Sequence, residues 1–224
     1  MKKLLTLAAI LLCANALAQD SIEQTLAERK KINRLATSEL NAKASKDARK
    51  MAKTYVKEGW EIAPGQLPLE KQLDRSYKMY YEYEESGLPK YIRGEAKSTG
   101  QFYDAAKMQA LEIAKTNLAG MIQTEIVALV ESTVANQQLS EEESVSVAKT
   151  VQASKNLIAQ RLGRVVPVVE CYRKTKNGVE VLVTVAYNSR MAYDYAKQVL
   201  KEQLEEQGTE LHKQLDELWD QNFK

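Results

Sequence analysis

The stretch RVVPVVECYRKTKNGVEVLVTVAY, residues 164–187, decides the fold because it contains two strand-like runs. Valine and other β-branched or aromatic residues dominate both runs, and Asn177-Gly178 between them is a dipeptide typical of hairpin turns. Pro167 lies near the start of the first run, where a missing N–H is tolerated only at a sheet edge or a bulge. The stretch therefore predicts an antiparallel hairpin whose first strand is an edge strand or contains a bulge.

The register of this hairpin can be argued from the faces of its two strands. A two-residue turn at the Asn-Gly dipeptide places Val181 on the same face as Lys174 and Tyr172. A three-residue loop, 176–178, instead collects one mostly apolar face and directs Cys171 into the core. We expect the second register, which pairs Thr175 with Val179, Arg173 with Val181, Cys171 with Val183 and Val169 with Val185.

Another strand and a long helix precede the hairpin in the sequence. Residues 91–99 alternate in the manner of a strand, and the small side chains of Gly94 and Ala96 indicate that a helix lies close against one face. A helix is expected over 104–134 because apolar residues recur there at helical spacing. These residues are Ala106, Ala110, Ala114, Leu118, Met121, Ile122, Ile126, Leu129 and Val130.

A second core helix is expected over 141–161. Ser140 and Glu143 form a capping box at its start, and Gly163 ends it. Its inner face comprises Val147, Val151, Ile158 and Leu162. This order of elements predicts an α+β fold, in which a small antiparallel sheet (one strand plus a hairpin) packs against two core helices, with long N- and C-terminal helices.

Composition divides the chain into six segments. Two glycines and two prolines in 59–68 break the helical pattern and predict a linker or an ordered turn. The helix expected next, 69–85, is rich in tyrosine. The predicted segments are a signal peptide (1–18), a basic N-terminal helix (19–58), a linker (59–68), a tyrosine-rich helix (69–87), an α+β domain (88–200) and an acidic C-terminal helical extension (201–224).

Charge is distributed unevenly between the two ends of the chain. Residues 19–57 contain ten basic and five acidic side chains, whereas residues 201–220 contain two basic and seven acidic ones. Both segments lack proline and are rich in helix formers. We consider three arrangements: two solvated helices that pack on the domain, an antiparallel pairing of the basic helix with the acidic one, and a basic helix that rests on anionic lipid headgroups or lipopolysaccharide.

The first eighteen residues have the pattern of a secretory signal. Two lysines precede an apolar run over 4–12 that is too short to span a bilayer. Ala16-Leu17-Ala18 supplies the small residues that signal peptidase requires, which favours cleavage after Ala18. Lipidation at Cys13 is the alternative, although Leu12 stands where a lipoprotein signal has a small residue. Either route predicts an exported chain, in the periplasm or associated with the outer membrane.

The composition of the mature chain argues against several classes of protein. The whole chain has 32 basic and 30 acidic residues, and removal of the signal removes two lysines, so the mature chain is formally neutral. We therefore expect no nucleic-acid binding, which requires a positive excess on the binding face. Of the two cysteines only Cys171 remains, which prevents an intramolecular disulfide and predicts a buried thiol.

No constellation in the sequence supports catalysis or a cofactor. A zinc site needs three or four ligands, but the mature chain has one cysteine and one histidine. His212 and Asp216 lie one turn apart in the acidic segment, as in a solvated helix pair. The sequence contains no phosphate-binding loop and no dinucleotide motif, so we expect no enzyme activity, no metal and no cofactor.

The segment SYKMYYEYEE, residues 76–85, contains four tyrosines that we consider as a ligand surface: Tyr77, Tyr80, Tyr81 and Tyr83. Such rings can stack on a sugar or a peptide. More often a tyrosine buries one ring face and keeps its hydroxyl in water. Exposed coplanar rings beside a concavity would favour ligand binding.

The central part of the chain resembles a known family. Gly94 and Ala96, the alanines leading into Asn117-Leu118-Ala119, and the valine-rich hairpin followed by a helix are similar to the domain of bacterial small outer-membrane lipoproteins of the LPP-twenty type. That domain is in turn similar to the N-terminal domain of a periplasmic flagellar-assembly protein. The resemblance covers residues 88–200, and residues 65–96 are similar to uncharacterised exported proteins of Gram-negative bacteria. The resemblance implies an α+β domain in the cell envelope with no catalytic residues.

Two functions from different classes fit these observations. The first is a non-enzymatic cell-envelope protein that acts as a structural or protein-interaction module. Its partner would be an envelope protein or a second copy of the chain, with contact to the outer-membrane surface as a further option. The alternative is a periplasmic module that binds a glycan or a peptide through the tyrosines. We expect the first, because packing residues dominate the sequence.

Overall fold

The computed structural model describes residues 40–85, 87–135 and 140–206, together with Lys30, Lys31, Arg34, Thr37, Ser38 and Trp219. The chain divides into two compact units, 1–43 and 44–224. In the first unit, the described residues among 30–41 are helical. The predicted signal segment with Cys13 lies outside the described residues, as does most of the acidic segment 201–224.

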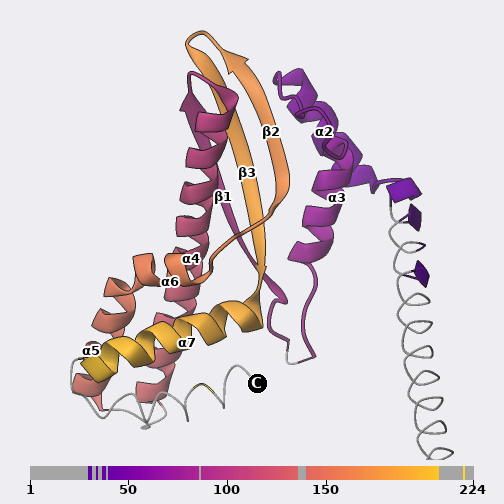
Figure 1. Ribbon diagram of the computed structural model, residues 1–224. Helices are drawn as coiled ribbons and strands as arrows, with labels where there is room; N and C mark the ends of the chain where they lie inside the picture. Colours follow the sequence, from indigo (N-terminus) through magenta and orange to yellow (C-terminus); the bar gives the residue numbers. More distant parts are fainter. Residues whose placement is uncertain are drawn as a thin grey trace, which may run out of the picture. The chain divides into compact units, whose positions relative to one another are not determined.

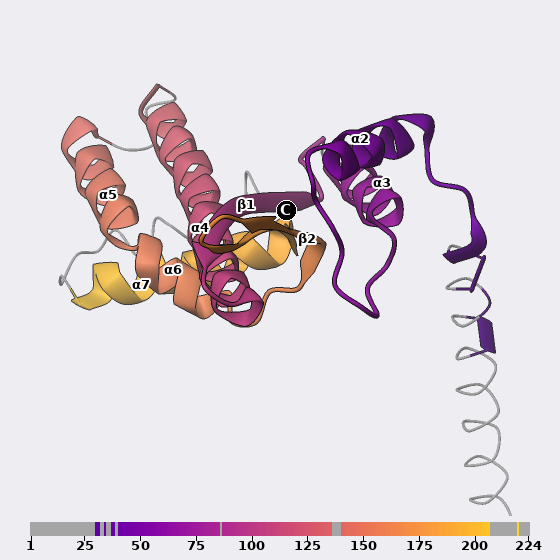
Figure 2. The ribbon, with the colours of Figure 1, turned by 90° about the horizontal axis from the view of Figure 1, so that it is seen from above.

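The second unit has the α+β fold that the sequence predicts. Its antiparallel sheet consists, in spatial order, of β1 (Tyr91–Gly100), β3 (Gly178–Asn188) and β2 (Pro167–Thr175). The long helix α4 (Tyr103–Ala135) covers one face, and the pair α2 (Lys46–Lys57) and α3 (Leu69–Tyr80) covers the other (Figure 1, Figure 2). Both faces of the sheet are therefore buried.

Small residues bring α4 very close to β1. Ala106, Ala110 and Ala114 of α4 are fully buried. A Cβ atom on Gly94 would lie 2.1 Å from the carbonyl oxygen of Ala114, so only glycine fits at this position. This contact confirms the close helix expected from Gly94 and Ala96. Of the residues expected on the inner face, Met121 is instead half exposed.

Three further helices pack around the part of α4 that extends beyond the sheet (Figure 1): α5 (Glu141–Ala153), α6 (Lys155–Arg161) and α7 (Ser189–Glu206). The capping box of Ser140 and Glu143 is present as expected. The single helix expected over 141–161 is wrong, because the chain breaks at Ser154. The Ser154 hydroxyl donates to the carbonyl oxygen of Thr150 over 2.7 Å, a bond of the kind that bends helices. Trp219 joins this core and is 3% exposed.

The hairpin register differs from the expected one. Thr175 pairs with Gly178, and Cys171 pairs with Leu182 rather than with Val183, so the turn consists of residues 176–177. The expectation failed because it assumed that one face of the hairpin is apolar, whereas both are. The valines of β3 join the core under α4, and Leu182 joins Cys171 in the core under α2 and α3.

Two other expectations about β2 are confirmed. β2 is an edge strand, and its register shifts between Pro167 and Val169. Cys171 is buried, with 1% of its surface exposed.

The tyrosine-rich helix is shorter than expected. α3 ends at Tyr80, not at residue 85, and a tight turn follows before β1. In this turn the N–H of Glu84 donates to the carbonyl oxygen of Leu88 over 2.8 Å, and the N–H of Lys90 donates to that of Glu82 over 2.9 Å.

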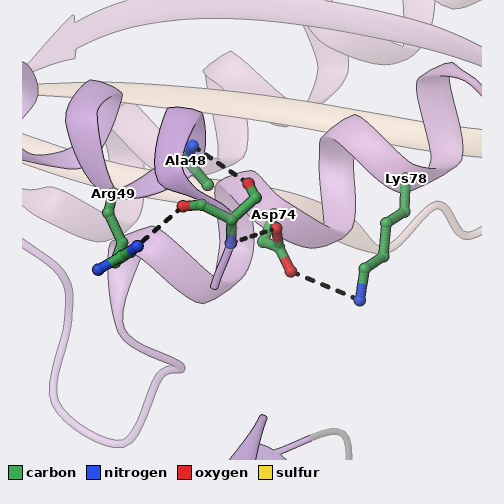
Figure 3. A network of polar contacts seen from close by, with 5 residues as sticks. Ala48, Arg49, Asp74 and Lys78 are labelled. Carbon is green, nitrogen blue, oxygen red and sulfur yellow. Dashed lines mark hydrogen bonds and ion pairs between the residues drawn. The ribbon is translucent and has the colours of Figure 1, made fainter. Parts of the chain in front are cut away.

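Ser45 begins α2 and links it to α3 (Figure 3). The Ser45 hydroxyl accepts from the N–H of Ala48 over 3.3 Å, and the Ser45 N–H donates to Oδ1 of Asp74 over 2.9 Å. Lys78 pairs with the same carboxylate at 3.4 Å. Partial burial acts to raise the pKa of Asp74, but the bonds from Ser45 and the ammonium of Lys78 outweigh it, so this pKa lies below its ordinary value.

Candidate functional site

The four tyrosines considered as a ligand surface are spread over α3 and the turn after it. Tyr80 and Tyr81 are exposed, but their rings meet edge to face, with centroids 4.8 Å apart and planes at 79°. The guanidinium of Arg93 lies over the Tyr80 ring, 4.1 Å from its centroid. Tyr77 packs partly buried against the core under α3, where burial raises its pKa, and Tyr83 is exposed in the turn. The coplanar rings that ligand stacking would favour are therefore absent between Tyr80 and Tyr81.

The buried thiol of Cys171 lies in an environment that keeps it protonated. Burial, followed by the charge of Glu95, raises its pKa to about 12. Because the thiolate is the reactive form of cysteine, this thiol is a poor nucleophile.

A largely buried group of polar side chains joins the start of α4 to β2. Glu170 is 5% exposed, and its carboxylate accepts from Nζ of Lys107 over 2.8 Å and from the hydroxyl of Tyr103. Burial and this bond to Glu170 raise the pKa of Tyr103. The Tyr103 ring meets that of Tyr172 edge to face at 5.4 Å. Each charge in the cluster has a partner, so the arrangement serves to connect α4 with β2.

A groove of about 460 Å³ lies between α2 and α3. Its lining combines three basic residues and one acidic residue with apolar side chains: Arg49, Lys53, Lys57, Glu70, Val56 and Leu69. This combination suits an anionic surface with apolar content.

Metal and membrane-spanning features are absent from the part of the chain that the structure describes. Among those residues, no group of three or more His, Cys, Asp or Glu side chains could hold a metal ion. Within the same residues, every helix is too short or too polar to cross a bilayer.

The outer edge of β2 is covered by other parts of the chain, and we call it the covered edge (Glu170 and Tyr172). Glu61 exchanges two backbone hydrogen bonds with Tyr172, of 2.7 and 2.8 Å. The side-chain oxygen of Gln72 accepts from the N–H of Glu170 over 2.7 Å. Gln72 is 6% exposed and is itself held by the carbonyl oxygen of Leu67, to which it donates over 2.8 Å.

These contacts fix the direction of every backbone group in the sheet. The groups of Tyr172 point outward, so the even-numbered residues of β2 face away from β3 and the odd-numbered ones bond to it. The even-numbered residues of β3 therefore bond to β2, and the odd-numbered ones bond to β1. It follows from the register that the even-numbered residues of β1 bond to β3. The odd-numbered residues of β1 point their N–H and C=O groups outward.

The outer edge of β1, from Arg93 to Thr99, is the open edge of the sheet. Among the residues that the structure describes, one outward group of this edge has a partner: the carbonyl oxygen of Glu95 accepts from Nδ2 of Asn117 over 2.9 Å. Within the described residues, the outward N–H and C=O groups of Arg93, Lys97 and Thr99 have no hydrogen-bond partner. A row of free backbone groups of this kind is a template for another strand.

The side chains on the open edge alternate in charge. Arg93, Glu95 and Lys97 all lie on the sheet face opposite α4. Glu95 accepts from the hydroxyl of Thr184 over 3.0 Å, and the Lys97 ammonium lies 5.6 Å from the centre of the Trp60 ring. The charges discourage indiscriminate pairing and leave room only for a strand with complementary charges.

Comparison with protein-family models, with curated proteins and with solved structures finds no match for this chain. The assignment of a function therefore rests on the geometry of the site. Sequence reasoning singled out the tyrosines, but it missed the open edge and the two residues that cover the other edge, Glu61 and Gln72. Only Gly94 and Ala96, which mark β1 as the strand beneath α4, pointed to this part of the molecule.

Proposed function

We propose that the chain is a non-enzymatic, exported protein of the cell envelope whose second unit is a protein-interaction module. The observation that carries this proposal is the contrast between the two edges of one sheet. The chain covers the β2 edge with Glu61 and Gln72, whereas among the described residues no strand pairs with the outer edge of β1 from Arg93 to Thr99. An added strand would satisfy these backbone groups, which is a common mode of protein recognition.

The chemistry of the buried polar groups supports a non-enzymatic role. The Cys171 thiol is buried with a raised pKa, and the Glu170 carboxylate is paired with Lys107 and Tyr103. An activated nucleophile or base would instead be free to meet a substrate.

The location in the envelope is supported by the sequence. The first eighteen residues have the pattern of a secretory signal, with cleavage after Ala18 favoured over lipidation at Cys13. The resemblance to small outer-membrane lipoproteins points to the same compartment. The groove between α2 and α3, with its three basic residues, would suit contact with an anionic membrane surface as an additional role.

A test of this function is photocrosslinking in intact envelopes. A photoreactive amino acid placed at Thr99 lies on the open edge, and the same amino acid at Thr175 is a matched control, since both residues are exposed threonines in edge strands. We expect protein adducts from Thr99 and few or none from Thr175. Equal yields from both positions, or none from Thr99, would overturn the role of the open edge.

The intact mass of the mature protein tests export separately. Cleavage after Ala18 gives a chain that begins at Gln19, and lipidation gives one that begins at a modified Cys13. A mass that retains residues 1–18 would contradict export.

A further inference from the structure

We infer that the strand that binds the open edge is β1 of a second copy of this chain, in an antiparallel pair centred on Ala96. This inference rests on the proposed function and names its partner. The pairing would join two three-stranded sheets into one six-stranded sheet around a two-fold axis. Such an isologous contact needs a self-complementary surface.

The direction of the backbone groups limits the registers that such a pair can adopt. Only the odd-numbered residues of β1 offer outward N–H and C=O groups, so each must lie opposite another odd-numbered residue. Three registers meet this condition near the middle of the strand, and they are centred on Gly94, Glu95 and Ala96.

Charge excludes the register centred on Glu95. It would place Glu95 opposite Glu95 of the second copy and Arg93 opposite Lys97, and like charges directly opposite each other destabilise a strand pair. The register centred on Ala96 places Glu95 opposite Lys97 in both halves of the pair. Two ion pairs then form across the axis.

The turn before β1 excludes the register centred on Gly94. That register would place Pro89 opposite Thr99 of the second copy, and proline has no N–H to donate. The register centred on Ala96 instead pairs Arg93, Glu95, Lys97 and Thr99 only with one another. Each of these residues can therefore both donate and accept across the pair.

The hydrogen bond already made by Glu95 is compatible with this pair. The carbonyl oxygen of Glu95 accepts from Asn117 at present. A carbonyl oxygen has two lone pairs, so it can also accept from the N–H of Lys97 in the second copy.

One flank of α4 adds apolar contact to the same interface. Gln109 accepts from the hydroxyl of Ser98 over 2.6 Å, and Asn117 reaches the edge at Glu95. Ile113 lies midway between Gln109 and Asn117 at intervals of four residues, so it lies on the same ridge, and it is 38% exposed. Gln109, Ile113 and Asn117 are all uncharged, so this ridge of α4 brings no charge repulsion to the interface.

The two helices would meet across the axis. A two-fold axis perpendicular to the sheet keeps both α4 helices on the same face. Paired strands lie about 4.8 Å apart, and each α4 packs on β1 and β3 of its own copy, so the two helices lie side by side on this face. Ile113 of each copy then lies close to the axis, at the level of Ala96.

Sedimentation of the mature full-length chain over a range of concentrations tests this pairing. We expect a monomer–dimer equilibrium. In the Ala96-centred pair, residue 95 of each copy faces residue 97 of the other. Glu95→Lys or Lys97→Glu therefore creates two pairs of like charges across the axis, and each substitution should raise the dissociation constant of the dimer by about tenfold or more. The double variant Glu95→Lys/Lys97→Glu restores both pairs and should recover the wild-type dissociation constant.

Proline substitutions test the backbone contribution. Lys97→Pro removes an outward N–H at the centre of the pair but none that bonds to β3, so the fold is retained and the dimer is lost. Lys174→Pro is the matched control, because Lys174 is an exposed lysine whose N–H points outward on the other edge strand. Far-ultraviolet circular dichroism of both variants measures whether each retains the fold.

A matched pair of substitutions on α4 tests the helix contact. Ile113→Asp lies on the ridge beside the open edge, whereas Met108→Asp lies on another side of the helix and is 70% exposed. We expect the first to weaken the dimer and the second to leave it unchanged.

Several outcomes would overturn self-pairing. These are a wild-type chain that stays monomeric, a Lys97→Pro variant that dimerises as tightly as Lys174→Pro, or a double charge variant that fails to recover. If the chain is monomeric and the photoreactive residue at Thr99 captures a different protein, self-pairing is wrong and the proposed function stands. If no adduct forms at Thr99 in envelopes, the proposed function fails as well.

Discussion

The two edge strands of this sheet receive opposite treatment from the rest of the chain. On β2, Glu61 and Gln72 bond to the backbone groups of Tyr172 and Glu170, and a bulge after Pro167 shifts the register. On β1, ten residues run without a bulge, and only the carbonyl oxygen of Glu95 has an outward partner among the described residues. The β2 edge shows that side chains of this protein can cover the edge of a sheet. The exposure of the β1 edge therefore supports the proposed role in protein interaction.

The difference also shows how two kinds of protection work. Covering an edge satisfies its hydrogen bonds and prevents any pairing. Charged side chains leave the hydrogen bonds free and restrict pairing to complementary partners. β2 uses the first kind, and β1, with Arg93, Glu95 and Lys97 in alternation, uses the second.

Hydrogen exchange offers the largest contrast between the two edges. In dilute solution, where the chain is monomeric, the amide of Lys97 should exchange roughly a thousandfold faster than that of Tyr172, because only the second is bonded. At concentrations that favour the dimer, the Lys97 amide should slow. Equal protection of both amides in dilute solution would mean that the open edge is covered within the chain itself.

Gly94→Ala should break the open edge most severely. The new Cβ would lie 2.1 Å from the carbonyl oxygen of Ala114, so β1 must move away from α4 and the free energy of unfolding should fall by about 3 kcal/mol. Urea unfolding measures this change. In the control Gly120→Ala, the nearest atoms are at 3.2 Å on the flexible Lys155 side chain, and stability should stay unchanged or rise by up to about 1 kcal/mol.

Gln72→Ala should convert the covered edge into a partly open one. The N–H of Glu170 loses its acceptor in a buried position, which should lower the free energy of unfolding by about 2 kcal/mol. We also expect light scattering to rise on storage, because β2 gains free backbone groups. Gln66→Ala removes only a 3.4 Å contact to Gln72 and should cost about 0.5 kcal/mol or less.

The smallest expected change in stability concerns Asp74, which links the two helices α2 and α3 that cover one face of the sheet. The folded pKa of Asp74 is lower than its ordinary value of 3.8, so its contribution is fully present above that value and is lost as the pH falls through the folded pKa. The loss should be at most about 1 kcal/mol. Thermal unfolding of the wild type and of Asp74→Asn between pH 7 and pH 3 measures it, and a difference between them that is independent of pH would contradict this role.

Much of the fold could be predicted from local patterns. The alanines of α4 and the small residues of β1 identified a helix lying close to a strand, and the capping box placed the start of α5. Pro167 predicted an edge strand or a bulge, and β2 has both. Each of these features is set by residues near one another in sequence or by a steric requirement of one position.

The features that sequence reasoning missed depend on tertiary contacts. The hairpin register was wrong because both faces of β3 are apolar, and only the packing of α2 and α3 on the second face reveals this. The break at Ser154 arises from a hydroxyl that reaches back to Thr150 inside a helical pattern.

The candidate site was the least predictable part of the molecule. No local pattern marked β1 as the other edge strand, and none indicated that Gln72, 98 residues before Glu170, bonds to it. The tyrosines attracted attention because aromatic clusters are visible in a sequence, whereas free backbone groups have no side-chain signature.

Trp219 has a consequence for the order in which the protein matures. The other members of its core precede it in sequence, and its side chain is buried among them. A ribosome synthesises the chain from its N-terminus, so this indole is the last member of the core to become available. Until then the core is missing a large aromatic group, whose removal from a folded protein costs about 3–5 kcal/mol. The core therefore reaches its full stability only after residue 219 has been added.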